Sequence, residues 1–137
     1  TIGWRVEFRP LEVQFTDFEN ASFAVFIVLL TRVILSFDLN FYIPISAVDE
    51  NMQRAQKRDA CLKEKFIFRS DIASSPSDET VEMTIDEIIN GSQDFVGLAL
   101  LVERYLDNLS IEIETRSQLQ EYIDLIKMRA MGKMRTP

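Results

Sequence analysis

Residues 21–35 form an apolar block that constrains the fold more than any other segment of the chain. Arg32 is the one charged residue in this block, and nearly all the others are apolar. Such a block either crosses a membrane or lies buried inside a protein. A bilayer requires about 20 consecutive apolar residues, so this shorter, interrupted block predicts a core helix that is buried nearly all round. We expect the helix to be capped by Asp17 or Asn20 and to run about 18 residues to near Asp38.

A strictly alternating segment precedes this block. Residues 4–9 switch between apolar and charged side chains, and the charged positions are Arg5, Glu7 and Arg9. Because successive side chains of a strand point to opposite faces, these three would share one polar face. A carboxylate suits Mg²⁺, and a neighbouring arginine can bind a phosphoryl group in bidentate fashion. The alternative is a structural row of ion pairs on an ordinary surface strand.

The alternation predicts a strand over residues 2–15, with a bend at Pro10, where the apolar phase slips. The remainder of the sequence favours helices, so the fold class is α+β, with one strand followed mostly by helices. A single strand cannot satisfy its own backbone groups. We therefore expect its sheet partners to lie in other sequence and the chain to be part of a larger protein.

Charge and composition exclude several classes of function. Residues 71–114 contain eleven acidic residues and one basic residue, Arg104, which disfavours nucleic acid as a partner. The chain contains no histidine, so neither a Ser-His-Asp triad nor a His-containing zinc site can form within it. The single cysteine, Cys61, provides no disulfide framework and fits a reducing, cytoplasmic location. We expect no membrane partner.

Several stretches of the sequence resemble one enzyme family. Residues 3–14 (GWRVEFRPLEVQ) and 16–20 (TDFEN) closely resemble the eukaryotic glutamate–cysteine ligase catalytic subunit. The similarity continues through residues 28–32, 48–52, 55–60 and 88–91. The resemblance covers nearly the whole chain. Residues 70–81 depart from the family in length and content.

The resemblance implies an activity and a set of site residues. The family joins the γ-carboxyl of L-glutamate to the amine of L-cysteine, using ATP and Mg²⁺, by a mechanism and fold similar to those of glutamine synthetase. By this resemblance Glu7 matches a metal-binding glutamate. Arg9 matches the arginine that stabilises the transferring phosphoryl group, and Arg5 is a further candidate for binding the nucleotide. A modifier subunit is an implied partner.

The sequence patterns, taken with this resemblance, divide residues 1–137 into sections of a single partial domain. They are an active-site strand (1–16), a core helix and a polar helix (17–70), a variable loop (71–83) and a helical section (84–137). Spacing of capping residues predicts the helix boundaries. We expect helices over 46–65, capped by Ser46 and Asp49; over 85–90, capped by Thr84 and Glu87 and ended by Gly91; over 95–109; and over 115–132, capped by Thr115 and Gln118.

Other polar residues carry weaker predictions. Glu12 and Gln14 lie past the bend and could support the site, whereas Asp17, Glu19 and Asn20 look like a helix-capping cluster. The basic residues Arg54, Lys57 and Arg58 lie near nucleotide or only solvate their helix. Cys61 is most simply a small buried side chain.

Two rival functions stay open at this point. One is a related carboxylate–amine ligase with a different amine acceptor, and the other is a non-catalytic helical interaction module. In every case we expect the isolated chain to be inactive, because one strand supplies too few ligands for Mg²⁺ and ATP.

Overall fold

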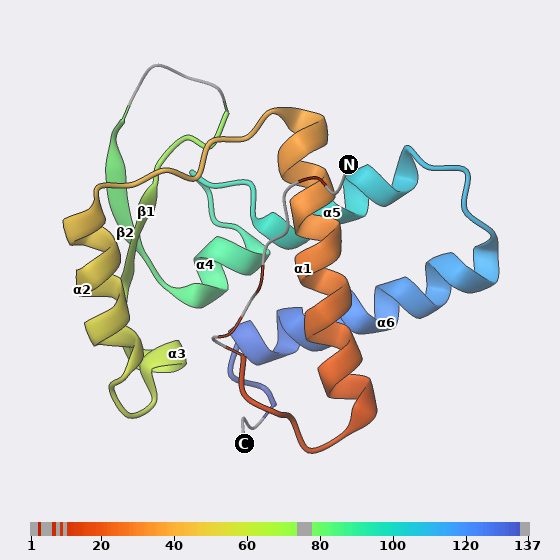
Figure 1. Ribbon diagram of the computed structural model, residues 1–137, viewed down its shortest axis with the longest axis horizontal. Coiled ribbons are helices and arrows are strands. Elements are labelled where there is room, and N and C mark those ends of the chain that lie inside the picture. The colour runs from red at the N-terminus through yellow and green to blue at the C-terminus, as the bar shows by residue number, and fades with distance from the viewer. Residues whose placement is uncertain (1–2, 4–6, 8, 10, 74–77, 135–137) are drawn as a thin grey trace.

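The computed structural model describes residues 3, 7, 9, 11–73 and 78–134 of the chain. In chain order the elements are α1 (Asp17–Phe37), α2 (Ile45–Ala55), α3 (Ala60–Lys63), β1 (Phe66–Arg69), β2 (Thr80–Met83), α4 (Ile85–Asn90), α5 (Leu98–Asp107) and α6 (Ile113–Ala130). Helix α1 crosses α5 and α6, while α2, α3 and the two strands lie to one side, and α4 lies between these two parts (Figure 1). The chain is thus of the α+β class.

The predicted core helix is present as α1, and its start is set by a capping box. The hydroxyl of Thr16 accepts a hydrogen bond from the backbone N–H of Glu19, and the Glu19 carboxylate accepts one from the backbone N–H of Thr16. These two bonds satisfy donors that a helix N-terminus otherwise leaves unpaired. The cap is therefore Thr16, not Asp17 or Asn20. The C-cap is Asp38, in the left-handed conformation with φ 52°.

The prediction that this helix is buried nearly all round is wrong within this chain. Its buried residues are Ser22, Phe26 and Val33, all on the side that meets α5 and α6. On the other side, Val28 is 60% exposed and Leu35 is 71% exposed. What covers an apolar helix is set by tertiary contacts, and the described residues cover one side of α1.

The prediction that the apolar block is too short to span a bilayer also needs correction, because the helix that contains the block is longer than the block itself. The helix has 21 residues and, by length and composition, is the one helix in the described part of the chain that could cross a membrane. Core helices of water-soluble proteins also satisfy this test. Within this chain α1 packs against α5 and α6.

Residues 46–65, predicted as one polar helix, divide into α2 and α3. Pro44 is the N-cap of α2 and makes no side-chain capping bond, so the predicted box of Ser46 and Asp49 is wrong. Between the two helices the chain turns, and Asp59 adopts the left-handed conformation with φ 59°. The turn ends α2 and separates it from α3.

Two short strands form a sheet that the sequence did not predict. Strands β1 and β2 pair antiparallel, with Phe66 opposite Met83 and Arg69 opposite Thr80. The predicted loop over 71–83 is therefore wrong for residues 80–83. The section 17–70, predicted as a core helix and a polar helix, contains a strand at residues 66–69. Each strand has four residues, too few to show a clear alternating pattern.

The predicted strand over residues 2–15 is not present in its described part. Residues 3, 7, 9 and 11–14 belong to no strand. A strand requires a neighbour that pairs with its backbone N–H and C=O groups, and the one sheet of the described residues pairs β1 with β2 alone.

The C-terminal helices follow the predictions more closely. The capping box of Thr84 and Glu87 is confirmed for α4, and Gly91 follows it with a φ of 93°. Gly97 is the N-cap of α5 and not an interior residue. The last helix begins at Ile113, before the predicted box at Thr115.

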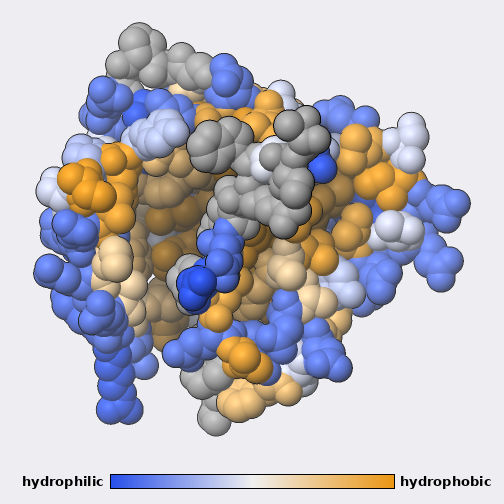
Figure 2. Space-filling model, viewed as in Figure 1, coloured by the Kyte–Doolittle hydropathy of each residue, from blue (hydrophilic) through white to orange (hydrophobic). Residues whose placement is uncertain are grey.

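The core lies where α1, α4, α5 and α6 meet. Its most buried members, each exposed by 1% or less, are Val33, Ala99, Val102, Leu106 and Ile123. Apolar side chains also line the hollow between α2 and α1 (Figure 2). There a groove over β1 is lined by Phe41, Ile43, Val48, Asn51, Met52, Ala55, Phe66, Ile67 and Phe68.

Candidate active site

Glu7 and Arg9, the two main candidates from the sequence, lie together on the surface. The Arg9 Nη2 atom is 3.1 Å from Glu7 Oε2, and the side chains of Arg9 and Glu7 are 82% and 72% exposed. An ion pair this exposed contributes little to stability. Little free energy would therefore be lost if Glu7 bound a metal ion and Arg9 a phosphate in place of each other. Arg5, the third candidate, lies outside the described residues.

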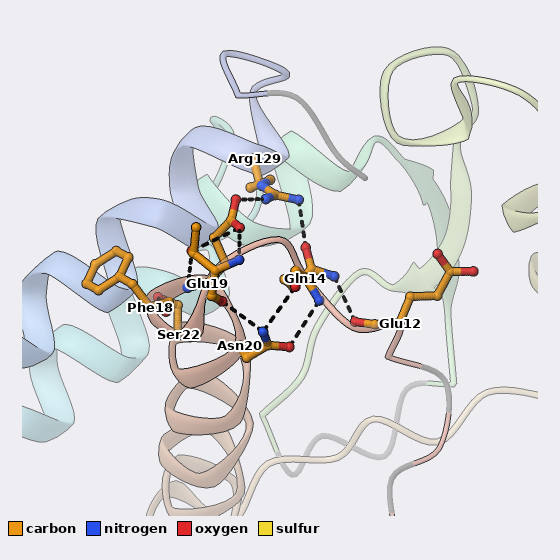
Figure 3. A network of polar contacts seen from close by, with 8 residues as sticks. Glu12, Gln14, Phe18, Glu19, Asn20, Ser22 and Arg129 are labelled. Carbon is orange, nitrogen blue, oxygen red and sulfur yellow. Dashed lines mark hydrogen bonds and ion pairs between the residues drawn. The ribbon is translucent and has the colours of Figure 1, made fainter.

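The described chain offers few further metal ligands near this pair. Among residues 3, 7, 9, 11–73 and 78–134, no group of three or more histidine, cysteine, aspartate or glutamate residues is placed to hold a metal ion. The Glu12 carboxylate is exposed and points away from the neighbouring polar cluster (Figure 3). Mg²⁺ binds through one or two carboxylates, water and substrate phosphates, so Glu7 fits as one ligand among others.

A polar cluster fixes the segment that follows the candidate pair. The side-chain amide of Asn20 donates to the backbone oxygens of Gln14 (3.2 Å) and Thr16 (2.8 Å), and its oxygen accepts from the backbone N–H of Gln14 at 3.0 Å. Arg129 of α6 donates through Nη1 to the side-chain oxygen of Gln14 at 3.0 Å and through Nη2 to Glu19 (Figure 3). We call Gln14, Thr16, Glu19, Asn20 and Arg129 the polar clasp.

Glu19 is charged within this clasp. Partial burial raises the pKa of Glu19, but hydrogen bonds from Thr16 and Arg129, and the positive charge of Arg129, outweigh it and leave the pKa below its usual value. The side chain of Glu19 is 13% exposed and that of Arg129 is 6% exposed. This pair is therefore a nearly buried ion pair that links the start of α1 to the end of α6.

A groove beside the clasp has the wrong charge for a nucleotide. Its volume is about 490 Å³, and its polar lining includes the carboxylates of Glu19, Glu121 and Asp124. Among the described residues, no lysine or arginine lines it. Because phosphate groups require positive charge or N–H donors, the groove is unsuited to ATP, and the exposed pair of Glu7 and Arg9 is the better phosphate-binding candidate.

Comparison with known proteins identifies the family. The family model described as glutamate-cysteine ligase matches residues 1–137. The glutamate–cysteine ligase catalytic subunit of Mus musculus is 50% identical over 153 residues, which cover 98% of this chain. This chain belongs to the glutamate–cysteine ligase family.

More distant members of the glutamate–cysteine ligase family match over the same extent. The glutamate–cysteine ligase of Neurospora crassa is 42% identical over 186 residues, covering 99% of the chain. That of Saccharomyces cerevisiae is 39% identical over 144 residues, covering 98%. The chain spans about a quarter of the length of these relatives, 24% of the mouse protein and 26% of the Neurospora protein.

Two of the three basic residues that were candidates for lying near nucleotide form ion pairs within the chain. Arg54 donates to Glu50, Glu82 and the backbone oxygen of Lys65, so its guanidinium joins α2 to the sheet. Lys57 pairs with Glu64 at 3.0 Å. Arg54 therefore has a structural role.

Cys61 is partly buried, whereas the sequence predicted a buried small side chain. Its Sγ donates to the backbone oxygen of Arg129 at 3.7 Å. Burial raises the pKa of the thiol, and the nearby charge of Asp86 raises it further. A raised pKa disfavours the reactive thiolate.

Arg129 is the residue of this region that the sequence did not single out. Its two acceptors, Gln14 and Glu19, lie 115 and 110 positions earlier in the chain. The one local signal was spacing, because Arg129 lies three positions after Ile126 and so falls on the apolar side of α6. An arginine there must find a partner or reach solvent.

Proposed function

We propose that this chain forms part of an ATP-dependent ligase that joins the γ-carboxyl of L-glutamate to the amine of L-cysteine, the first step of glutathione synthesis. Membership of the glutamate–cysteine ligase family over residues 1–137 carries the proposal. The exposed pair of Glu7 and Arg9 supports it with a carboxylate and a guanidinium 3.1 Å apart.

In the proposed reaction the γ-carboxylate of glutamate attacks the terminal phosphorus of ATP, giving γ-glutamyl phosphate and ADP. The cysteine amine then attacks the acyl carbon, loses a proton and expels phosphate. The protein does little covalent work in such a transfer and acts by positioning and by stabilising charge. The proposed fold around this site is similar to that of glutamine synthetase.

The two site residues take different roles. Glu7 provides one carboxylate ligand for Mg²⁺, which, when bound, neutralises charge on the phosphates of ATP. Arg9 binds oxygens of the transferring phosphoryl group through its planar fork, a geometry that lysine cannot reproduce. Arg5, two positions before Glu7 on an alternating segment, is the third candidate, for contact with the nucleotide.

Further properties belong to the same proposal. The chain by itself is inactive, because Glu7 alone cannot complete a Mg²⁺ site and the amino-acid pockets need other residues. We propose a cytoplasmic protein without nucleic-acid or membrane partners, since its middle section is acidic and α1 packs against α5 and α6. A modifier subunit is a further proposed partner.

The test measures ADP release by the full-length protein that carries this chain, with glutamate and cysteine supplied. We expect Glu7→Gln to abolish most turnover and Arg9→Lys to reduce it strongly, with the fold intact by circular dichroism. Glu114→Gln, an exposed glutamate at the start of α6, is the matched control and should keep full activity. Unchanged turnover in Glu7→Gln would reject the proposed site.

A second measurement tests the amine acceptor. Product formation is compared with cysteine and with ammonia at equal concentrations of glutamate and ATP. A clear preference for cysteine supports the proposal, whereas equal or better use of ammonia assigns the chain to a ligase with another acceptor.

A further inference from the structure

We propose that Arg129 is a positioning residue that holds the segment carrying Glu7 and Arg9 in its working place. The inference rests on the proposed function of those two residues. Arg129 lies near the end of α6, far from them in sequence, and reaches the segment that follows them through the polar clasp (Figure 3). It touches neither substrate nor metal in this role.

The two halves of the Arg129 fork bind two different parts of the preceding segment. Nη1 donates to the Gln14 side chain at 3.0 Å, and Nη2 donates to Glu19 in the first turn of α1. The Gln14 backbone is also held, because its N–H and C=O both bond to the Asn20 side chain. The guanidinium therefore fixes the point at which the chain enters α1.

This clasp is the fixed point close to the candidate site. Gln14 lies five positions after Arg9, a span of at most about 18 Å for an extended chain. Residues 11, 12 and 13, between them, are all exposed. Gln14 is the first described residue after Arg9 whose side chain bonds to a distant part of the chain. A shift of Gln14 would therefore move Glu7 and Arg9.

Burial makes the clasp sensitive to substitution. Arg129 is 6% exposed, its Cζ lies 6.0 Å from the centre of the Phe23 ring, and its Nε is buried without a hydrogen-bond partner among the described residues. Removing the guanidinium would leave the Glu19 carboxylate nearly buried without its counter-charge, which is unfavourable. The Gln14 side chain would also lose its attachment to α6, which leaves the bonds to Asn20 as the remaining hold on this segment.

The experiment compares Arg129→Met and Arg129→Lys with Arg116→Met in the full-length protein. Arg116 lies on the same helix and pairs with Asp107 and Gln120, away from the clasp, so it is the matched control. Glutamate- and cysteine-dependent ADP release is measured against Mg²⁺ concentration, and rates are expressed per folded molecule.

We expect Arg129→Met to lower kcat by roughly ten- to a hundred-fold, the size of effect that a small misplacement of catalytic groups produces. We also expect it to raise the Mg²⁺ concentration that gives half-maximal rate, because Glu7 is displaced. Arg129→Lys should recover little, since lysine lacks the fork that serves both acceptors. Arg116→Met should change neither quantity.

A purely structural role would give a different pattern. Arg129→Met would then lower the folded fraction, while kcat per folded molecule and the Mg²⁺ dependence stayed at wild-type values, and this result would overturn the inference. Should Arg129→Met fail to fold, Gln14→Met replaces it. That variant removes one acceptor, keeps the pair of Arg129 and Glu19, and should raise the Mg²⁺ requirement in the same direction; an unchanged requirement overturns the inference.

Failure of this inference is distinguishable from failure of the proposed function. If Glu7→Gln abolishes turnover and neither clasp variant changes the Mg²⁺ dependence, the inference alone is rejected. If Glu7→Gln keeps full turnover, the proposed function is rejected, and the inference with it.

Discussion

The side-chain amide of Asn51 bonds both backbone groups of Ile67. Asn51 Nδ2 donates to the Ile67 oxygen at 2.8 Å, and Asn51 Oδ1 accepts from the Ile67 N–H at 2.8 Å. The amide thus acts on β1 as a neighbouring strand would, on the edge away from β2. Because an unpaired strand edge invites association with other chains, this contact both attaches α2 to the sheet and closes its edge.

Replacing this amide should destabilise the sheet. We expect Asn51→Leu to lower the free energy of unfolding by about 1–3 kcal/mol, since it leaves a partly buried N–H and C=O without partners. Gln53→Ala, an exposed position on the same helix, should change it by less than about 0.5 kcal/mol. Urea denaturation of the three proteins checks this, and equal midpoints for all three would contradict it.

Gly97 should tolerate no side chain. Its φ is 79°, and an added Cβ would lie 2.6 Å from the Gly91 nitrogen and 2.7 Å from the carbonyl carbon of Asn90. Both are backbone atoms, so neither can move aside without shifting the turn between α4 and α5. We expect Gly97→Ala to cost at least about 2 kcal/mol of unfolding free energy.

Gly3→Ala is the control for this substitution, because a Cβ at Gly3 would meet nothing within 4 Å. Thermal unfolding followed by circular dichroism compares the two variants. A melting temperature for Gly97→Ala close to that of Gly3→Ala would show that the turn rearranges freely.

The capping box of α4 should contribute to acid sensitivity. Glu87 accepts hydrogen bonds from the N–H and hydroxyl of Thr84 at 2.8 and 2.9 Å. These bonds lower the pKa of Glu87 below its ordinary value of 4.5, although burial opposes them. A carboxyl whose pKa is lower in the folded state stabilises the fold above its unfolded pKa, and this stabilisation disappears as the pH falls through the folded pKa.

The free energy of unfolding should therefore decrease as the pH falls below about 4.5, and Glu87→Gln should reduce that decrease. Glutamine keeps an acceptor for the cap but does not titrate in this range. Thr84→Ala removes the hydroxyl donor and should weaken the dependence in the same direction. Urea titrations at pH 7 and at several acidic pH values measure it; identical pH dependence in wild type and Glu87→Gln would contradict the assignment.

Local signals predicted the local structure well. The pairs Thr16–Glu19 and Thr84–Glu87 have the spacing of a capping box, and both boxes form, although only the second was predicted as such. The apolar block gave helix α1 to within a few residues at each end. Such features depend on residues three or four positions apart, which the sequence displays directly.

Features that depend on distant partners were missed or wrong. Strand β1 exists because β2 pairs with it, and four residues show no usable periodicity. The burial of Arg69, 1% exposed, depends in part on the backbone oxygen of Tyr42, 27 positions earlier. Likewise, the role of Arg129 follows from acceptors more than 100 positions away, which no local pattern reveals.

The roles of Glu7 and Arg9 stay predictions. The sequence placed their side chains on one side of the chain, and the 3.1 Å contact between them agrees with this. The predicted strand is wrong in its described part, because the described residues offer no strand that pairs with that segment. The polar clasp behind them required the fold of α1 against α6.

The exposed side of α1 gives a last prediction about the chain on its own. Leu35 is 71% exposed, whereas Val33, two positions earlier, is completely buried. Exposed apolar surface of this kind promotes association. We expect Leu35→Lys to reduce light scattering in concentrated solution and to change the unfolding free energy by less than about 0.5 kcal/mol.

Val33→Lys should lower the unfolding free energy by several kcal/mol at the least, or prevent folding, because the ammonium would enter the contact between α1 and α5 without a partner. Urea denaturation and static light scattering of both variants measure these effects. If Leu35→Lys were as destabilising as Val33→Lys, the two sides of α1 would be equally packed, contrary to the asymmetry seen in the fold.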